Sequence, residues 1–405
     1  MTTTDWRPNS WIRRIVAWSC LAGFCLSLRA EDVTVRSAKR IGGDPKTGIA
    51  QAVVVDSSVL LHTRQFLPVD QFGEVAGRTL PDQADSVWKQ LNVELRDQGL
   101  ALNQLLKLNV CVANETVAGE FRQFLAERLQ GQPAVAVSFV QSRLPKPAAL
   151  LGIDAVALAQ PTAETRRQNR INNSSRLTSA ILPAGPRLYV SGQAEKGDDL
   201  AEATRKTLVS LQNTLRHLGG DLADVVQVKS FLTPMSEVAA ADRAISDFFG
   251  KSVPPCVFVE WQSSLPIEVE LVAAARPTVG QTEPLEFITP PGMTASPVFC
   301  RVVRINDPRT IFVSGLYAKD ATDGTGQVTQ VFEQLQDILK ASGSDLRHLA
   351  KATYYVSDND ASAKLNELRP KFYDPQRPPA ASKAQVFGVG LAGKSLTLDM
   401  IAVPK

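Results

Sequence analysis

Three stretches of the sequence align residue for residue: LNVELRDQGLAL (91–102), LQNTLRHLGGDL (211–222) and LQDILKASGSDL (335–346). The offsets between them are 120 and 124 residues, and apolar residues recur in each at the spacings of three and four that mark one face of a helix. Each helix is expected to end at a glycine, which adopts the left-handed conformation without a Cβ clash: Gly99, Gly219 and Gly343. The alignment predicts three copies of one structural unit.

The residues after each helix have the composition of a β-strand: LLKLNVCVA (105–113), VVQVKSFLT (225–233) and LAKATYYVS (349–357). A second helix and two strands follow, and the last strand reads LGIDAVAL (151–158), IEVELVAA (267–274) or LTLDMIAV (396–403). Each unit therefore reads β-β-α-β-α-β-β. A helix between two strands implies a parallel crossover, and the strand pairs at either end are expected to be hairpins. The prediction is an α+β fold with two helices on one face of a mixed sheet.

Polar or proline-rich linkers, at 161–175 and 276–292, divide the chain into units near 46–160, 172–276 and 286–405. The strands carry bulky apolar residues on both alternations. One face of each sheet is expected to pack on the helices of its own unit. The other face needs a cover in a soluble protein, and we expect the other two units to provide it.

Residues 1–30 have the layout of a secretory signal peptide: a start ending in Arg13-Arg14, an apolar run at 15–28, and Ala30 before an acidic pair. The run is short for a membrane span, which needs about 20 residues. We expect cleavage after Ala30 and an exported protein, periplasmic or secreted, without a membrane attachment. An uncleaved signal anchor is the alternative.

The composition excludes some classes of function. Lys plus Arg number 44 and Asp plus Glu 41, and the small excess lies in the first thirty residues, so the remaining chain is neutral. Nucleic-acid binding depends on cationic neutralisation of phosphates, so no nucleic-acid partner is expected. The three histidines, His62, His217 and His348, show no metal-ligand or catalytic-triad spacing, and no metal is predicted.

Cys20 and Cys25 lie in the signal segment, which leaves Cys111, Cys256 and Cys300 in the mature chain. Three cysteines allow at most one disulfide within the chain. Buried thiols that act as small apolar side chains are the favoured interpretation, and their pairing is left open.

The order and spacing of the motifs resemble the RidA (YjgF) superfamily, also called L-PSP endoribonucleases. The motifs are a strand ending in Ser-Gly, as in YVSGQ (189–193) and VSGLY (313–317), and a late segment from Val253, VPPCVFVEWQSSLPIEVELVA. The similarity is strongest in the second unit and weakest in the first. It implies a chorismate-mutase-like fold. Because family members are homotrimers with ligand sites between subunits, it also implies an intramolecular pseudo-trimer that exists as a monomer.

The resemblance implies deaminase-like hydrolysis of small reactive enamines and imines, without a cofactor. In the family an arginine binds the substrate carboxylate, a glutamate positions the attacking water, and a Ser-Gly pair lines the site. The arginine positions here are Val135, Cys256 and Ala381. The glutamate positions are Gly152, Glu268 and Thr397. The Ser-Gly positions are Thr63-Arg64, Ser191-Gly192 and Ser314-Gly315.

No unit keeps the full set, and the second keeps the most. We therefore predict Glu268 as the catalytic residue, in one cleft with three substrate-binding residues: Ser191, Gly192 and Cys256. Ser314 and Gly315 are predicted to bind substrate in the third unit. Arg64 is either a carboxylate anchor on a different wall or a surface arginine.

Two function classes stay open: an imine-hydrolysing enzyme with a remodelled cleft, and a non-catalytic module that binds a small metabolite or a partner protein. The retained glutamate favours the first class and the missing arginines favour the second. The ribonuclease activity in the family's label is disfavoured by the neutral charge and the lack of a histidine pair.

Two further patterns bear on the site. Acids recur at equivalent places of the three last strands (Asp154, Glu270 and Asp399), where they line a water-filled centre or a cleft, or lie solvated or paired. GVGLAGK (388–394) contains G-x-G-x-x-G, but a strand follows it, whereas a dinucleotide site needs a helix there. We expect a flexible hairpin loop.

Overall fold

The computed structural model describes residues 38–405 except 57–58, 161–175, 279, 281 and 295. The predicted signal segment lies outside the described residues, so cleavage and export stay predictions. Residues Arg36–Lys405 form one compact unit. Within it, the described residues form three six-stranded mixed sheets and six α-helices.

The first sheet is built mainly from the first repeat. Its strands, in order across the sheet, are β2 (Ile49–Ala50), β6 (Val135–Gln141), β5 (Leu105–Val112), β7 (Leu151–Leu158), β4 (Leu60–Thr63) and β8 (Ser179–Leu182). The first repeat also contains the helices α1 (Leu80–Asp97), η1 (Leu102–Gln104) and α2 (Glu115–Arg128).

The second sheet repeats this pattern. Its strands, in order, are β11 (Cys256–Glu260), β10 (Val225–Leu232), β12 (Ile267–Ala274), β9 (Arg187–Gln193), β14 (Val302–Ile305) and β13 (Leu285–Ile288). The helices of the second repeat are α3 (Leu200–His217), η2 (Leu222–Asp224), η3 (Met235–Glu237) and α4 (Val238–Phe249).

The third sheet begins with two strands from the start of the chain. Its strands, in order, are β1 (Ala38–Ile41), β3 (Ala52–Val55), β15 (Thr310–Val313), β18 (Leu396–Ala402), β16 (Leu349–Val356) and β17 (Ala380–Gln385). The helices of the third repeat are α5 (Gly324–Ala341), η4 (Leu346–His348) and α6 (Asn359–Phe372).

The predicted helix ends are confirmed. Gly99, Gly219 and Gly343 follow α1, α3 and α5 with φ between +70° and +78°, the left-handed region that a Cβ disfavours. At the other end, the side chains of Thr79, Asp199 and Asp323 cap these helices by accepting backbone N–H bonds. The cap, the apolar face and the terminal glycine therefore agree on one helix in each repeat.

The structure corrects the predicted hairpins. The first strand of each repeat pairs with the preceding sheet around the ring: β8 with β4, β14 with β9, and β3 with β15. The last two strands of a repeat are also not a hairpin, since β5 lies between β6 and β7. The exchange is head-to-tail and closes after three steps, so every sheet contains strands from two repeats.

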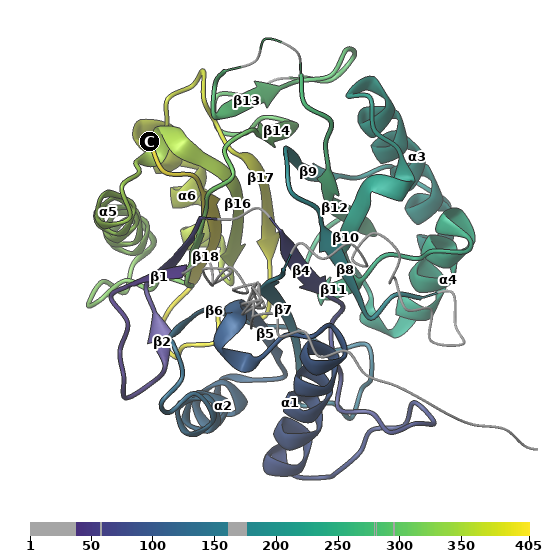
Figure 1. Ribbon diagram of the computed structural model, residues 1–405, viewed down its shortest axis with the longest axis vertical. Coiled ribbons are helices and arrows are strands. Elements are labelled where there is room, and N and C mark those ends of the chain that lie inside the picture. Colours follow the sequence, from purple (N-terminus) through teal and green to yellow (C-terminus); the bar gives the residue numbers. More distant parts are fainter. Residues whose placement is uncertain (1–37, 57–58, 161–175, 279, 281, 295) are drawn as a thin grey trace, which may run out of the picture. The chain divides into compact units, whose positions relative to one another are not determined.

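The sheets enclose a common core, and the helix pairs α1/α2, α3/α4 and α5/α6 lie outside them (Figure 1). The core combines apolar side chains from all three sheets, among them Val156, Val272, Val303, Phe312 and Ile401. The units therefore cover one another's inner sheet faces, and the chain is an intramolecular pseudo-trimer. We expect a monomer in solution, which light scattering on the purified protein would test.

The glycine-rich loop at 388–394 is also not a hairpin, because β17 and β18 lie on opposite sides of β16. The loop packs on the first unit: Gln141 N donates to Gly388 O at 2.8 Å, and a Cβ on Gly390 would lie 2.7 Å from the Cβ of Phe139. These glycines serve a close contact between units.

The three cysteines of the described residues are unpaired and buried. Burial raises the pKa of Cys111, Cys256 and Cys300 to about 12, so the thiols stay neutral at physiological pH.

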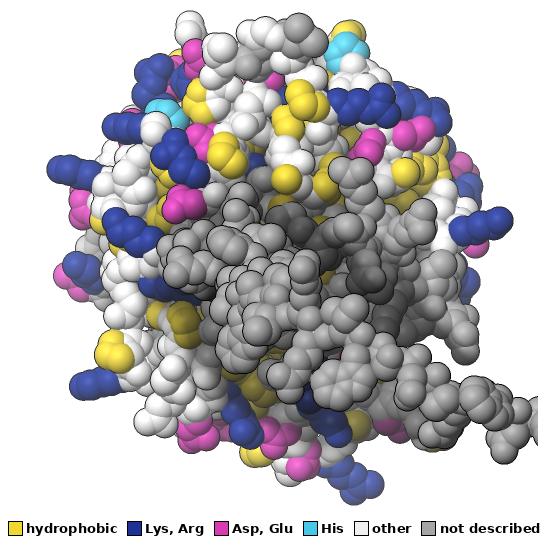
Figure 2. Space-filling model, viewed as in Figure 1, with side chains coloured by type: hydrophobic (Ala, Val, Ile, Leu, Met, Phe, Trp, Pro, Cys, Tyr) yellow, Lys and Arg dark blue, Asp and Glu magenta, His cyan; other side chains and the backbone are white. Residues whose placement is uncertain are grey.

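None of the helices in the described part of the chain has both the length and the apolar character needed to cross a membrane. On the face shown in Figure 2, basic and acidic side chains are interspersed instead of forming a patch of one sign.

Candidate functional site

The strand register defines which residues of the three repeats are equivalent. Val137, Cys256 and Ala381 lie beside Leu108, Val228 and Ala352, which occupy the same position on the three central strands. The arginine position of the first unit is therefore Val137, two residues after the predicted Val135. No unit has an arginine at this position.

At the contact between the second and third units, which we call the second cleft because it is equivalent to the other two, the structure brings together Ser191 and Gly192 of β9, Glu268 of β12, and Ser382 of β17. The Ser382 hydroxyl accepts a hydrogen bond from Gly192 N at 3.0 Å. A Cβ on Gly192 would lie 2.0 Å from Glu268 Oε1, so glycine leaves the space that the carboxylate occupies. The predicted contact between Ser191-Gly192 and Glu268 is thus present.

The polar groups of the second cleft are incompletely bonded. Among the described residues, neither Ser191 Oγ nor Glu268 Oε1 has a hydrogen-bond partner, and both atoms are buried. Burial raises the pKa of Glu268 to about 7, and the nearby charge of Glu270 adds to the effect, while Ser382 and Arg301 act in the opposite direction. The cleft therefore holds a carboxyl group that is near half-ionised at neutral pH.

The structure places Cys256 in a different cleft from Ser191, Gly192 and Glu268. β11 lies at the opposite end of the second sheet's core from β9, with β10 and β12 between them, and so faces the preceding unit. Gln65 N donates to Cys256 O at 2.9 Å, which joins β11 to the residues after β4. The four residues that we grouped in one cleft are thus divided between two.

The first cleft lies between the first and second units and has a volume of about 390 Å³. Arg64 and Cys256 both line it. Arg64 replaces the family glycine in the first unit, and Cys256 replaces the family arginine in the second unit. The glutamate position of this cleft is Gly152. The first cleft has a cation on an unexpected wall and no carboxylate at the family position.

The third cleft keeps the Ser-Gly pair, but the serine is already engaged. Ser314 Oγ donates to Ala50 O at 2.6 Å and accepts from Val137 N at 2.8 Å, while Gly315 N donates to Val137 O at 2.9 Å. The pair borders a groove of about 690 Å³. Thr397 replaces the glutamate, so the third cleft offers no general base at that position.

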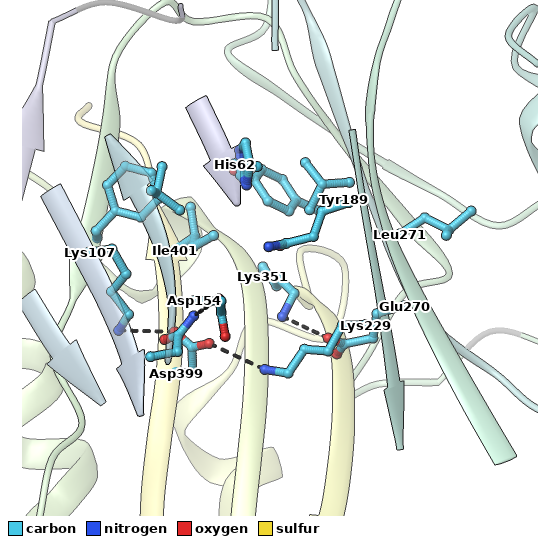
Figure 3. A pocket seen from close by; sticks show the side chains of 15 residues that line it. His62, Lys107, Asp154, Tyr189, Lys229, Glu270, Leu271, Lys351, Asp399 and Ile401 are labelled. Atoms are coloured by element: carbon cyan, nitrogen blue, oxygen red, sulfur yellow. Dashed lines mark hydrogen bonds and ion pairs between the residues drawn. The ribbon is translucent and has the colours of Figure 1, made fainter. Parts of the chain in front are cut away.

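A chamber of about 40 Å³ lies where the three sheets meet (Figure 3). This volume accommodates about one to three water molecules. The three recurring acids, Asp154, Glu270 and Asp399, line it together with three lysines that the sequence analysis did not single out: Lys107, Lys229 and Lys351. The acids were expected either to line a centre or a cleft, or to be solvated or paired. The structure shows a part of each alternative, because the acids line a central cavity and two of them form ion pairs with lysines.

Each ion pair of the chamber joins two different units. Lys107 Nζ lies 3.1 Å and Lys229 Nζ 3.7 Å from Asp399, and Lys351 Nζ lies 2.9 Å from Glu270. The three lysines hold the pKa of Asp399 well below its usual range despite burial. Asp154 accepts a hydrogen bond from Asn109 at 2.9 Å instead of forming a close ion pair, and burial raises its pKa to about 6.

His62 and Tyr189 border the chamber on the side away from the ion pairs (Figure 3). Both ring nitrogens of His62 and the hydroxyl of Tyr189 lack a hydrogen-bond partner among the described residues. Burial lowers the pKa of His62 to about 4, so the imidazole is neutral at pH 7. These groups can bind water that occupies the chamber.

A family model described as Endoribonuclease L-PSP matches residues 167–275 and 293–403, more than half of the chain. The chain belongs to this family, and the second and third units carry the match.

Individual relatives align with about a quarter of the chain. A RutC family protein of Pyrococcus abyssi is 32% identical over 107 residues, covering 24% of this chain and 84% of the relative. Protein DfrA of Myxococcus xanthus is 28% identical over 112 residues, covering 26% and 84%. Among solved structures, the YjgF gene product of E. coli is 23% identical with a TM-score of 0.22, covering 23% of this chain and 83% of that chain.

Proposed function

We propose that the protein hydrolyses small reactive imines or enamines in the second cleft, with Glu268 as the general base. The observation that carries this proposal is the Glu268 carboxylate beside Ser191 and Gly192: one of its oxygens has no hydrogen-bond partner in the described part of the chain, and its pKa is raised to about 7. A general base works best when its pKa lies near the operating pH. Family membership supports the substrate class.

The reaction needs one water molecule. Glu268 takes a proton from the water as its oxygen adds to the imine carbon, and the protonated carboxyl group then gives a proton to the nitrogen. The carbinolamine then gives its hydroxyl proton to Glu268, which passes it to the nitrogen as the C–N bond breaks, and the products are a carbonyl compound and ammonia. Ser191 Oγ, which has no partner among the described residues, is available to hold the water or the substrate nitrogen.

The substrate preference follows from Ala381 at the arginine position. A hydrogen bond to a charged group contributes about 1.5–3 kcal/mol, so an acidic imine loses that amount at this wall. We therefore expect the protein to favour uncharged imines, or imines anchored in another way, over acidic ones.

The test is ammonia release from 2-iminobutanoate and from an uncharged imine of similar size. Replacing Glu268 by Gln should lower the rate about 10²–10⁴-fold, because general-base catalysis supplies an acceleration of that order. The matched control is Thr397→Val, which alters the same strand position in the third cleft and should leave the rate unchanged. Turnover that survives Glu268→Gln would contradict the assignment.

A non-catalytic binding module is the second candidate. The absence of arginine from all three arginine positions, Val137, Cys256 and Ala381, favours it. Failure to hydrolyse any imine, together with binding of a small metabolite, would support this alternative over the enzyme.

A further inference from the structure

Arg64 lines a preformed cleft and has no carboxylate of the described residues within ion-pair distance. Partial burial and the charge of Arg176 lower the pKa of its guanidinium, and the more distant charge of Glu94 raises it. The Arg64 side chain is exposed in the first cleft, and it forms no ion pair and no side-chain hydrogen bond with any described residue. Its guanidinium lies 5.8 Å from the centre of the Phe66 ring, a distant contact between cation and aromatic face. The five N–H donors of the guanidinium therefore remain available to a ligand.

The other charged groups of the first cleft leave a positive excess. Arg176 is bound by Asp242, with Nη1 2.5 Å from Oδ1 and Nη2 2.8 Å from the backbone oxygen, so this pair is neutral overall. Lys146 also lines the cleft and forms no ion pair within the described part of the chain. Arg64 and Lys146 thus face one space without a free carboxylate.

The remaining wall is largely apolar. Leu67, Leu177, Val238, Pro254 and Phe258 line the cleft beside Cys256, whose thiol is neutral. A cavity of about 390 Å³ is in the range of small-ligand sites, which typically combine apolar walls with a few polar groups. The cleft therefore suits an anion with an apolar body.

We propose that the first cleft is a binding site for a small organic carboxylate, whose anionic end pairs with Arg64 and whose apolar part lies against Cys256 and Phe258. Guanidinium and carboxylate form two parallel hydrogen bonds, which favours a carboxylate over a single-point anion. The anchor comes from the first unit, whereas the family's arginine position, Cys256, belongs to the second unit, so the carboxylate is bound from a different unit than in the family. Because Gly152 stands at the glutamate position, the site retains its ligand without hydrolysing it.

The experiment is calorimetric titration of the mature protein with benzoate and butanoate, and with benzamide as the uncharged isostere. We expect carboxylate binding, little or no benzamide binding, and at least tenfold weaker benzoate binding in Arg64→Gln, because a charge-assisted hydrogen bond is lost. Arg205→Gln, which removes an exposed arginine on α3 outside the cleft, is the matched control and should bind as wild type.

Three outcomes would overturn the proposal: equal binding of benzamide and benzoate, unchanged benzoate binding in Arg64→Gln, or tighter binding of inorganic phosphate than of either carboxylate. Glu268→Gln separates this site from the proposed catalytic one, since it should lower the rate of hydrolysis about 10²–10⁴-fold and leave benzoate binding intact. Loss of benzoate binding in Glu268→Gln would place the carboxylate in the second cleft and contradict the inference.

Discussion

The clefts between units and the chamber on the central axis come from the same strands but differ in how far the three repeats have diverged. The glutamate position of the clefts is Gly152, Glu268 or Thr397, three different chemistries. Two residues further along the same strands, the chamber keeps an acid in all three places. The physical cause is that the charged groups of the chamber are paired between units, whereas each cleft is independent of the other two.

Each cleft is bounded by only two units, so a residue can change there without consequence for the other clefts. In the chamber, five of the six charged groups form ion pairs that each join two units, and the sixth, Asp154, is bonded to a neutral amide. Losing one partner leaves an uncompensated buried charge. A single chain carrying three non-identical repeats can specialise its clefts one by one, while the chamber constrains the repeats together.

The largest effect on stability is expected from Lys351→Met. This change removes the ammonium 2.9 Å from Glu270 and leaves that buried carboxylate without its cation. Breaking a buried pair from one side costs about 3–5 kcal/mol in the free energy of unfolding. Urea denaturation would measure it, with Lys364→Met at the exposed Lys364–Glu367 pair as the control that should show no measurable change. A loss below about 1 kcal/mol would mean that the chamber does not constrain its residues.

The second effect is a pH dependence that originates in Asp154. Its pKa is raised from a usual value near 3.8 to about 6, so the folded state binds the proton more tightly than the unfolded state does. This carboxyl group therefore stabilises the fold fully below about pH 4, and the contribution of roughly 2–3 kcal/mol is lost as the pH rises to about 6. Asp154→Asn should remove this fall. Unfolding curves of wild type and variant that run parallel between pH 4 and 6 would refute the prediction.

A smaller loss of stability, with a large loss of activity, is expected from Gly192→Ala. The new Cβ would lie 2.0 Å from Glu268 Oε1 and forces the carboxylate into another rotamer, at about 1 kcal/mol. Imine hydrolysis should fall to the level of Glu268→Gln. Gly315→Ala, at the same place in the third cleft, should leave hydrolysis intact. Full activity of Gly192→Ala would show that the position of Glu268 is not important.

The smallest effect on stability is expected from Arg64→Gln. The side chain is exposed and forms no ion pair with a described residue, so the free energy of unfolding should change by no more than about 0.5 kcal/mol. Thermal unfolding of wild type and variant would measure this. A clear destabilisation would mean that Arg64 stabilises the fold, and that its role is not limited to the first cleft.

Much of the fold could be predicted from local patterns. Helical spacing, terminal glycines such as Gly99 and the repetition at offsets of 120 and 124 predicted three units with the correct elements. The pairing of β8 with β4 could not be predicted in this way, because a strand presents the same alternation whether it bonds to its own unit or to the next one. The hairpin expectation followed from chain proximity alone.

The candidate site was predicted in part. The contact between Glu268 and Ser191-Gly192 followed from the family motifs and is present in one sheet. Arg64 and Cys256 line the same cleft because the edge of the second sheet that carries Cys256 contacts the first unit. Neither sequence motif specifies which units are in contact. The lysines of the chamber were missed, although Lys107 and Lys351 occupy equivalent positions in the repeats and offered a detectable pattern.

The sequence by itself determined the three repeats, their helices and strands, and which family residues each repeat keeps or loses, because these properties depend on residues close along the chain. Only the tertiary structure decided which repeats share a cleft, which cation lines which cleft, and how the charged groups of the chamber are paired. Those outcomes depend on contacts between residues as far apart as Lys107 and Asp399, and on the closure of the strand exchange into a ring of three. The physical reason is that burial and pairing set the energy of a charged side chain, and both are properties of the assembled sheets.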